Sequence, residues 1–437
     1  MVKVDFSRKA GKIKPLHGIN NGPLSSECVT DTSKYYKEIG IPFVRLHDTD
    51  WPSFKLVDIP KIFPDFDADP EDPNNYRFEQ TDQTIEAIVR TGAKVLYRLG
   101  TSIEHTKVKR FAVPPKDFVQ WAKICIGVIR HYNEGWADGY HFNIKHWEIW
   151  NEPENSDQMF AGGTAEDYYN LYVTSTKMIR EYDATLKLGG YAAGYLPDAG
   201  PDDHYFSNFL RRVKEENAPL DFFSWHIYTS DIKAIERRAD YVKRELDKYG
   251  FGDIEIYLDE WNYFDADWVE FLSPDGEYLR RSVFEKVRSQ LGAAFTTAAI
   301  VRMQTLPVDI AFYYDGQPRL DWCGLFDFYG CPGKTFHAMK AFGLLYKDGN
   351  SVWSVSETDD IYCLATENYV LLVNYGAEAG HYMVDLNNIR GGKVETYILD
   401  ECNDLELTRT EYFEGYRLTQ RVYLSENSVA LLKISDL

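Results

Sequence analysis

Short apolar runs alternate with amphipathic segments from Lys12 to about Tyr346, and this alternation constrains the fold more than any other feature of the chain. The apolar runs are rich in β-branched and aromatic residues, which favour strands, and the segments between them have a helical period. Repeated βα units of this kind build a parallel sheet covered by helices. Eight strands are predicted, at residues 16–20, 43–47, 94–99, 145–150, 187–191, 222–227, 255–258 and 309–313.

Eight strands with helices between them predict an α/β protein with a closed (β/α)₈ TIM barrel. Two of the predicted helices are residues 81–91, which have an apolar face and end before Gly92, and the longer segment 277–303. An open, doubly wound sheet is the alternative. It has less support, because no G-x-G-x-x-G sequence follows the first strand.

The pattern changes after Gly349 to short alternating runs separated by Asn, Asp and Gly, which predict a small all-β sandwich domain. We therefore expect a catalytic barrel over residues 10–348 and a β-sandwich accessory domain over 349–437, which residues 1–9 can join as a strand. A chain of 437 residues is long enough for both. Strands of the second domain are predicted at residues 361–366, 369–375, 381–386, 393–399, 421–424 and 428–434.

Charge and cysteine usage narrow the range of partners and compartments. The 68 acidic and 48 basic residues give a net charge of −20, so neither nucleic acid nor an anionic membrane is an expected partner. Six scattered cysteines without a C-x-x-C pair predict reduced thiols. The first residues lack the apolar core of a signal peptide, which predicts a cytoplasmic protein. A secreted protein stays open as the alternative, since a cleaved signal peptide would leave the same sequence.

The fourth and seventh predicted strands each end on an acid beside a tryptophan. The fourth runs into Trp150-Asn151-Glu152-Pro153, and because proline cannot continue a strand ladder, Asn151 and Glu152 should emerge at its end. The seventh ends on Asp259-Glu260-Trp261. Barrel enzymes keep their chemistry at the carboxyl ends of the strands. Two carboxylates meeting there predict glycoside hydrolysis, with retention if they lie about 5–5.5 Å apart and inversion at about 6.5–9.5 Å.

These two motifs, together with His17-Gly18-Ile19-Asn20, resemble those of clan A glycoside hydrolases, particularly family 39, which includes β-xylosidases and α-L-iduronidases. The resemblance covers residues 10 to 346, and the β domain fits the same layout. It implies that Glu152 is the general acid/base and Glu260 the nucleophile of a retaining double displacement. It also implies that Asn151 binds the sugar 2-hydroxyl, a bond that can strengthen in the transition state.

Strand alternation sends only one of the neighbours Asp259 and Glu260 inward, and the resemblance favours Glu260. The general acid must hold a proton near neutral pH, so Glu152 needs a raised pKa, whereas Glu260 must stay ionised.

The remaining candidates are predicted to bind substrate. His226 and Tyr228 lie at the end of the sixth strand, where the resemblance implies a role in contacting the sugar or orienting the nucleophile; a structural histidine is the alternative. Asp48 can accept hydroxyl protons or cap a helix, and tryptophans near the mouth can stack on a sugar or fill the core. The full set is Asn151, His226, Tyr228, His17, Asp48, Arg45, Trp261 and Trp322.

No metal site or cofactor is predicted, because the chain has no H-E-x-x-H or comparable spacing and the reaction needs neither.

The predicted activity is that of an exo-acting β-1,4-xylosidase on plant-type oligosaccharides, and the family resemblance also implies self-association. One alternative is another family-39-type glycosidase, such as an arabinosidase, iduronidase, glucosidase or galactosidase. A uronate substrate would need a cation from Arg45, Arg98 or Lys334. The other alternative is a non-catalytic carbohydrate-binding barrel, which the presence of both acids disfavours.

Overall fold

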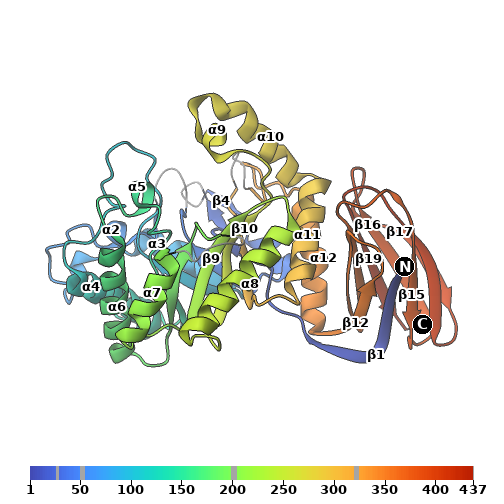
Figure 1. Cartoon of the computed structure of the whole chain (residues 1–437), viewed down its shortest axis with the longest axis horizontal. Helices are drawn as coiled ribbons and strands as arrows, with labels where there is room; N and C mark the ends of the chain where they lie inside the picture. The colour runs from blue at the N-terminus through green and yellow to red at the C-terminus, as the bar shows by residue number, and fades with distance from the viewer. Residues whose placement is uncertain (26–28, 50–54, 198–203, 319–323, 437) are drawn as a thin grey trace.

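Eight parallel strands close into a barrel in the computed structural model, which describes residues 1–25, 29–49, 55–197, 204–318 and 324–436 (Figure 1). This confirms the predicted (β/α)₈ fold, and each strand overlaps a predicted one. The barrel closes where β10 and β2 pair with the two edges of β11. The strands are β2 (Gly18–Asn20), β5 (Phe43–Leu46), β6 (Lys94–Leu99), β7 (His146–Ile149), β8 (Lys187–Ala193), β9 (Phe222–Tyr228), β10 (Glu255–Asn262) and β11 (Ile310–Tyr313).

Helices surround the barrel, and most of them are amphipathic. The helix expected over residues 277–303 is divided into two, because Ser289 has an extended backbone and its hydroxyl accepts a hydrogen bond from Leu291 N as the N-cap of the second helix. The surrounding helices are α1 (Ser33–Ile39), α3 (Glu79–Thr91), α4 (Phe118–Glu134), α6 (Ala165–Tyr182), α7 (His204–Glu215), α8 (Ile232–Tyr249), α10 (Glu277–Arg288), α11 (Gln290–Met303) and α12 (Lys334–Asp348).

The two ends of the barrel differ. Near the amino ends of the strands the interior is filled by a buried apolar cluster that includes Phe43, Phe222 and Phe312. The loops after the strand carboxyl ends carry short elements, and α9 and α10 project above this end (Figure 1). The short elements are β3 (Leu24–Ser25), β4 (Thr30–Asp31), α2 (Ile59–Ile62), η1 (Pro73–Asn75), α5 (Ser156–Met159), α9 (Trp268–Leu272) and η2 (Pro274–Gly276). A ligand can therefore enter at the carboxyl end.

A nine-stranded sheet forms the second part of the fold, with the order β17-β16-β19-β14-β13-β12-β1-β15-β18. Val4, Leu386, Leu424 and Leu432, from strands in different parts of the sheet, share one apolar core, as in a sandwich. Two of its strands, β12 and β17, were not predicted. The strands are β1 (Val2–Lys12), β12 (Asn350–Ser356), β13 (Ile361–Thr366), β14 (Tyr369–Asn374), β15 (Gly380–Asn387), β16 (Gly392–Leu399), β17 (Asp404–Phe413), β18 (Arg417–Leu424) and β19 (Ser428–Ser435).

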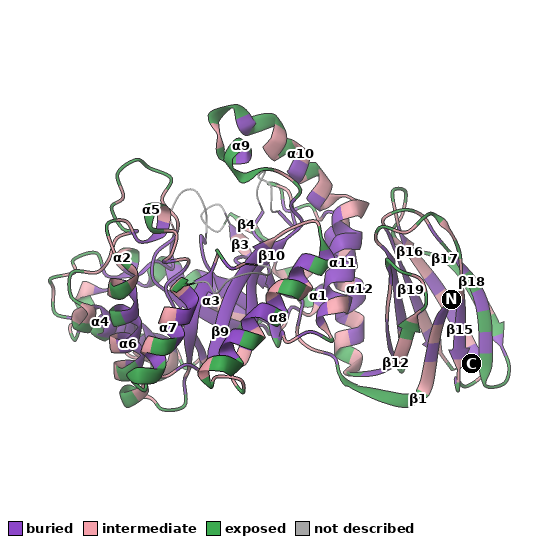
Figure 2. Ribbon diagram, in the orientation of Figure 1, coloured by how far each residue is buried: buried purple, intermediate pink, exposed green. Residues whose placement is uncertain are grey.

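The barrel and the sheet share a buried interface along α11 and α12 (Figure 2). Leu371, Leu399 and Leu431 of the sheet belong to the same apolar cluster as the barrel helices. We keep the division at residues 348 and 349 as a proposal for the domain organisation; the pairing of β1 with both β12 and β15 supports adding residues 1–9 to the second domain. Within the described residues, no helix has both the length and the apolar character needed to cross a bilayer.

Candidate active site

The chain turns sharply after β7 and this turn places Glu152 at the barrel mouth. Trp150 and Glu152 both have positive φ angles, 70° and 43°. The Trp150 ring is buried among the outer helices, where its Nε1 donates to Met159 O at 2.8 Å. Glu152 N donates to Ala192 O at 3.1 Å, which ties the turn to β8. With Trp150 anchored outside, Asn151 and Glu152 are directed over the barrel.

Both acids at the end of β10 reach the centre of the site, so the prediction that only one of them faces inward is wrong. The pairing of β10 with β9 is irregular between Leu258 and Glu260, which leaves Asp259 as an extra residue. Such a bulge interrupts strand alternation. The Asp259 and Glu260 carboxylates consequently lie 3.0 and 2.8 Å from nitrogens of the same arginine, Arg45.

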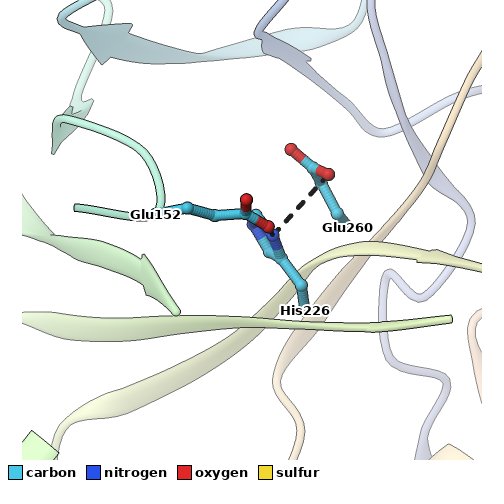
Figure 3. Close-up of side chains that lie close together, drawn as sticks. All are labelled: Glu152, His226 and Glu260. Carbon is cyan, nitrogen blue, oxygen red and sulfur yellow. Dashed lines mark hydrogen bonds and ion pairs between the residues drawn. The ribbon is translucent and has the colours of Figure 1, made fainter. Parts of the chain in front are cut away.

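Glu152 and Glu260 face each other across the mouth, with His226 of β9 between them (Figure 3). Their nearest carboxylate oxygens lie within 4.8 Å of each other and of a His226 ring nitrogen. The Nδ1 atom of His226 is 2.8 Å from Glu152 and 3.6 Å from Glu260. This separation of the nearest oxygens suits a retaining pair of carboxyl groups better than the wider spacing of an inverting pair.

His226 is positioned to carry a charge. Its Nε2 lies 3.4 Å from Asp259 Oδ1, so each ring nitrogen faces a carboxylate. Burial opposes the charge, but Glu260 and Asp259 outweigh it and raise the pKa of His226 well above its usual range. A doubly protonated ring can donate to Glu152 and Asp259 at once, which fixes the orientation of both.

Arg45 is the centre of a buried polar network beneath the site. It is fully buried, and its side-chain nitrogens have acceptors within 3.1 Å on Glu148, Asp259, Glu260, Asn151 and Asn20. Because the guanidinium is used in this way, it holds the nucleophile candidate in place and is not available to sugar hydroxyls. The expected substrate contact by Arg45 is therefore corrected to a contact with Glu260.

Asn151 and Tyr228 complete the surroundings of Glu260. Arg45 Nη2 donates to Asn151 Oδ1 at 2.6 Å, which fixes the amide and leaves its nitrogen as the group able to donate to a sugar. The Tyr228 hydroxyl donates to Glu260 Oε2 at 2.8 Å. Since Arg45 donates to Oε1, the two oxygens of Glu260 have different partners and a defined orientation.

Three buried carboxyl groups of this region have shifted pKa values. Burial raises the pKa of Glu260, and His226 and Arg45 oppose that rise. Burial also raises the pKa of Glu148 to about 8 against the pull of Arg45. For Asp259, burial is outweighed by Arg45 and His226, which hold its pKa below the usual value. Near neutral pH, Glu148 therefore carries the proton of this pair and Asp259 the charge.

Glu154 and Gly194 hold the turn that surrounds Glu152. Glu154 Oε1 accepts hydrogen bonds from the backbone nitrogens of Gly194 and Tyr195 at 2.7 and 3.0 Å. Burial, reinforced by the neighbouring Glu152, raises the pKa of Glu154 to about 8. A Cβ atom on Gly194 would lie 2.4 Å from Glu152 Oε1. The carboxyl group of Glu152 therefore depends on a residue without a side chain at position 194.

Asp48 lies at the edge of the same site. Its Oδ2 is 3.5 Å from His47 Nε2 and accepts from the Tyr314 hydroxyl at 3.3 Å, and its Oδ1 accepts from Ile103 N at 3.0 Å. His47 Nε2 is 3.8 Å from Glu260. Asp48 is the N-cap of no helix in the described part of the chain; its hydrogen bond from Ile103 N ties the loop after β6 to the edge of the sugar site.

Two predicted substrate contacts are corrected by the structure. His17 precedes β2 and is fully buried, with its ring against Phe342 and Tyr346 and its Nε2 3.2 Å from Gly40 O, so it packs against α12 and does not reach the mouth. Trp261 is fully buried and packs against Phe295 and Tyr313, because alternation beyond the bulge turns it outward. Trp322 lies outside the described residues.

Arg98 and Lys334, the other two cations that could bind the carboxylate of a uronate, each form an ion pair with another residue of the protein. Arg98 is fully buried and pairs with Asp58 at 2.7 Å. Lys334, at the start of α12, pairs with Asp404 of β17 at 2.7 Å, in the interface with the sheet.

Glu152, His226 and Glu260 are also close enough together to hold a metal ion. They are the one such group found among the described residues. A metal ligand must be an unprotonated imidazole. The raised pKa of His226 and its contacts with two carboxylates favour the protonated ring. These residues therefore fit proton transfer and nucleophilic attack better than metal coordination.

Sequence reasoning did not identify Glu148, Glu154 and Gly194. A charged residue in the middle of a buried strand was the available signal for Glu148, since such residues are paired when buried. In the sequence, Glu154 looks like an ordinary surface charge in a loop. Gly194 looks like any other loop glycine. No local pattern separates these two from ordinary loop residues.

The fold and this site define the class of the protein, a glycosidase with a TIM-barrel catalytic site. The chain belongs to the glycosyl hydrolases family 39, whose sequence model matches residues 4–353. A β-xylosidase of Geobacillus stearothermophilus is 23% identical over 366 residues, covering 75% of this chain and 68% of that protein. A β-xylosidase of Caldicellulosiruptor saccharolyticus is 23% identical over 474 residues, covering 99% and 88%. The crystal structure of a glucosidase from Croceicoccus marinus has the same fold, with a TM-score of 0.83 at 22% identity and coverage of 100% and 98%.

Proposed function

We propose that the protein is a retaining glycosidase in which Glu260 is the nucleophile and Glu152 the general acid/base. The observation that carries this proposal is the separation of the two carboxylates, whose nearest oxygens lie within 4.8 Å. That spacing suits attack by one carboxylate on the anomeric carbon while the other protonates the leaving-group oxygen.

The neighbouring residues support these roles. Arg45 and Tyr228 each donate to one oxygen of Glu260 and aim it at the ring, and Arg45 partly offsets the rise in the pKa of Glu260 that burial causes. His226 contacts Glu152 and can stabilise its carboxylate after the proton has been given to the leaving group. Asn151 is held by Arg45 in reach of a 2-hydroxyl beside Glu260. Asp48 is proposed to accept a sugar hydroxyl at the rim.

We further propose exo-acting hydrolysis of terminal β-1,4-linked xylose from plant-type oligosaccharides. Two relatives named β-xylosidase support the sugar, and the glucosidase with the same fold makes a glucoside the principal competitor. A uronate in this position has less support, because Arg45 and Arg98 are both engaged with protein carboxylates. Location in the cytoplasm and self-association remain predictions.

The roles of the two acids are tested by azide rescue. Glu260→Ala should lower kcat by about 10³-fold or more. Azide that replaces the missing nucleophile attacks a β-xyloside once, so the rescued product should be the α-xylosyl azide. In Glu152→Ala the glycosyl-enzyme still forms from a substrate with an activated leaving group, and azide attacks in the second step. That variant should give the β-xylosyl azide.

The exposed residue Glu401 offers a control, since Glu401→Gln should retain wild-type kcat and form no azide adduct. Exchange of the two anomeric products between the variants would reverse the assigned roles, and full activity of Glu260→Ala would refute the nucleophile. A screen of chromogenic pentosides, hexosides and uronides tests the sugar. A higher kcat/KM on any of these than on the β-xyloside would overturn the specificity.

A further inference from the structure

A cavity of about 620 Å³ lies between the loop after β6 and the segment around α5. One wall is formed by His105, Thr106, Lys107 and Lys109, and the other includes Asp157 and Gln158. None of these residues takes part in the arrangement around Glu260.

Both walls connect directly to the site. Asn155, which precedes α5, is 3.5 Å from Glu152 Oε2 through its Nδ2, so the wall with Asp157 continues the turn that carries the acid. The opposite loop is tied to the sugar site through Ile103 N and Asp48 Oδ1 at 3.0 Å. Since the general acid protonates the leaving-group oxygen, a cavity on its side is suited to the leaving sugar.

The charge of this cavity contrasts with that of the chain. The protein carries a net charge of −20, yet residues 105–110 read His-Thr-Lys-Val-Lys-Arg. Lys109 Nζ donates to the carbonyls of Glu104 and Thr106, both at 2.5 Å, and to Gln158 Oε1 at 2.9 Å, which fixes the loop against α5 and keeps its charge at the cavity wall.

The acids near this loop offset only part of that charge, since two lysines and one acid line the cavity. Glu104 uses one carboxylate oxygen to accept the backbone nitrogens of Arg110, Phe111 and Ala112 at 2.7 to 3.2 Å, which turns it into the loop. Asp157 is the one acid that lines the cavity, against Lys107 and Lys109. Lys107 is exposed and is one of the residues that line the cavity.

We propose that this cavity is a leaving-group subsite that accepts a sugar bearing a carboxylate, so that the enzyme releases its terminal residue from acidic oligosaccharides. This inference rests on the proposed glycosidase function and adds the chemical class of the substrate's second unit. Long flexible lysine side chains suit a carboxylate whose position varies with the linkage.

The test uses two disaccharides that differ in one charge: β-1,4-xylosyl-glucuronate and its methyl ester. The quantity measured is the ratio of kcat/KM for the acid to kcat/KM for the ester. Comparing this ratio between enzyme variants cancels the intrinsic reactivity of the two substrates. An exposed ion pair contributes about 0.2–1 kcal/mol, so Lys107→Ala should lower the ratio by up to about fivefold, and Lys107→Glu by more. Raising the NaCl concentration from about 0.05 to 0.5 M should lower the wild-type ratio, because screening shortens the reach of the lysines.

Lys116→Ala is the matched control. It removes the same charge from an exposed side chain of the following segment, which pairs with Asp67, and should leave the ratio unchanged. A wild-type enzyme that cleaves both substrates with a ratio unaltered by Lys107→Glu would overturn the subsite and leave the proposed function standing. If the wild type cleaved neither these disaccharides nor aryl β-xylosides, the proposed function would fail with it.

A second readout separates binding of the leaving sugar from a structural role of Lys107. In a double displacement the leaving sugar has gone before the glycosyl-enzyme is hydrolysed. The charge of Lys107 should therefore act on glycosylation and not on the rate at which a trapped glycosyl-enzyme turns over. An equal effect of Lys107→Glu on both steps would contradict the subsite.

Discussion

Glu148 shows how much of this site depends on single buried protons. The residue is fully buried in β7, its carboxylate lies 2.8 Å from Arg45 Nε, and burial raises its pKa to about 8. With Asp259 and Glu260 on the same guanidinium, a third full negative charge would be poorly compensated. A proton on Glu148 avoids it.

Because Glu148 holds this proton in the folded protein, we expect the free energy of unfolding to depend on pH. The folded-state pKa of Glu148 is above the ordinary glutamate value, so its bound proton stabilises the fold fully at low pH and progressively less as the pH rises towards 8. Glu148→Gln keeps an acceptor for Arg45 without the titration. Between pH 5 and 8 the Tm of the variant should therefore fall less than that of the wild type. The difference should be on the order of 1 °C for each kcal/mol of linkage in a chain of 437 residues that unfolds in one transition.

Differential scanning calorimetry at several pH values measures this difference, with the exposed Glu401→Gln as the control that should follow the wild-type curve. Parallel Tm curves for Glu148→Gln and the wild type would show that Glu148 does not hold an extra proton in the folded protein.

At the scale of secondary-structure elements, the turns after two neighbouring strands together position Glu152. The turn after β7 carries Glu152, and the turn after β8 carries Gly194, whose backbone is held by Glu154. The space beside Glu152 Oε1 exists because position 194 has no Cβ. The location of the acid is therefore a property of two adjacent turns.

Gly194→Ala should displace the Glu152 carboxyl group without unfolding the barrel. The added Cβ would lie 2.4 Å from Glu152 Oε1. Displacement of a catalytic group by about 1 Å can cost about 10²-fold in rate. We expect a loss of this size in kcat/KM for aryl xylosides with basic leaving groups, and a smaller loss for activated ones, which need less protonation.

The control is Gly380→Ala in β15, where an added Cβ meets nothing within 4 Å. Circular dichroism checks the fold of both variants. An equal loss across leaving groups in Gly194→Ala would mean that the acid is not the group disturbed.

At the scale of the whole molecule, the barrel helices and the nine-stranded sheet share one buried apolar cluster. Eleven of the 14 residues of α11 are buried, and sheet residues Leu371 and Leu431 pack in the same cluster as the barrel helices. The Tyr375 hydroxyl also donates to Ser230 O, in the loop after β9, at 2.6 Å. The sheet thus covers a helix face that would otherwise be exposed apolar surface.

We expect a single thermal transition in which catalytic activity and the β-sheet signal are lost together. Leu431→Asp would place an unpaired charge in the shared cluster, at a cost of several kcal/mol, and should lower the Tm of both signals equally. Tyr412→Asp, at a side chain that is 67% exposed, is the control. Loss of the sheet signal while activity persists would show that the two parts unfold independently.

Much of this architecture was predictable from local patterns. Strand and helix periodicity identified all eight barrel strands, and the residues after two of them identified the acids that meet at the mouth. The failures have separate causes. Strand β17 is an exposed edge rich in charged residues and lacks a buried apolar pattern. The bulge at Asp259 and the burial of Trp261 depend on how β10 pairs with β9, which the sequence of β10 does not encode locally.

The sequence by itself therefore determined the barrel, because hydrophobic periodicity is a local property, and it determined which carboxylates stand at strand ends. Only the tertiary structure decided that oxygens of Glu152 and Glu260 lie within 4.8 Å, that Arg45 is a buried partner of the nucleophile candidate, and that the loop after β6 and the segment around α5 line one cavity. These are distances between segments far apart in the chain. They are set by closure of the barrel and by the turns that follow its strands.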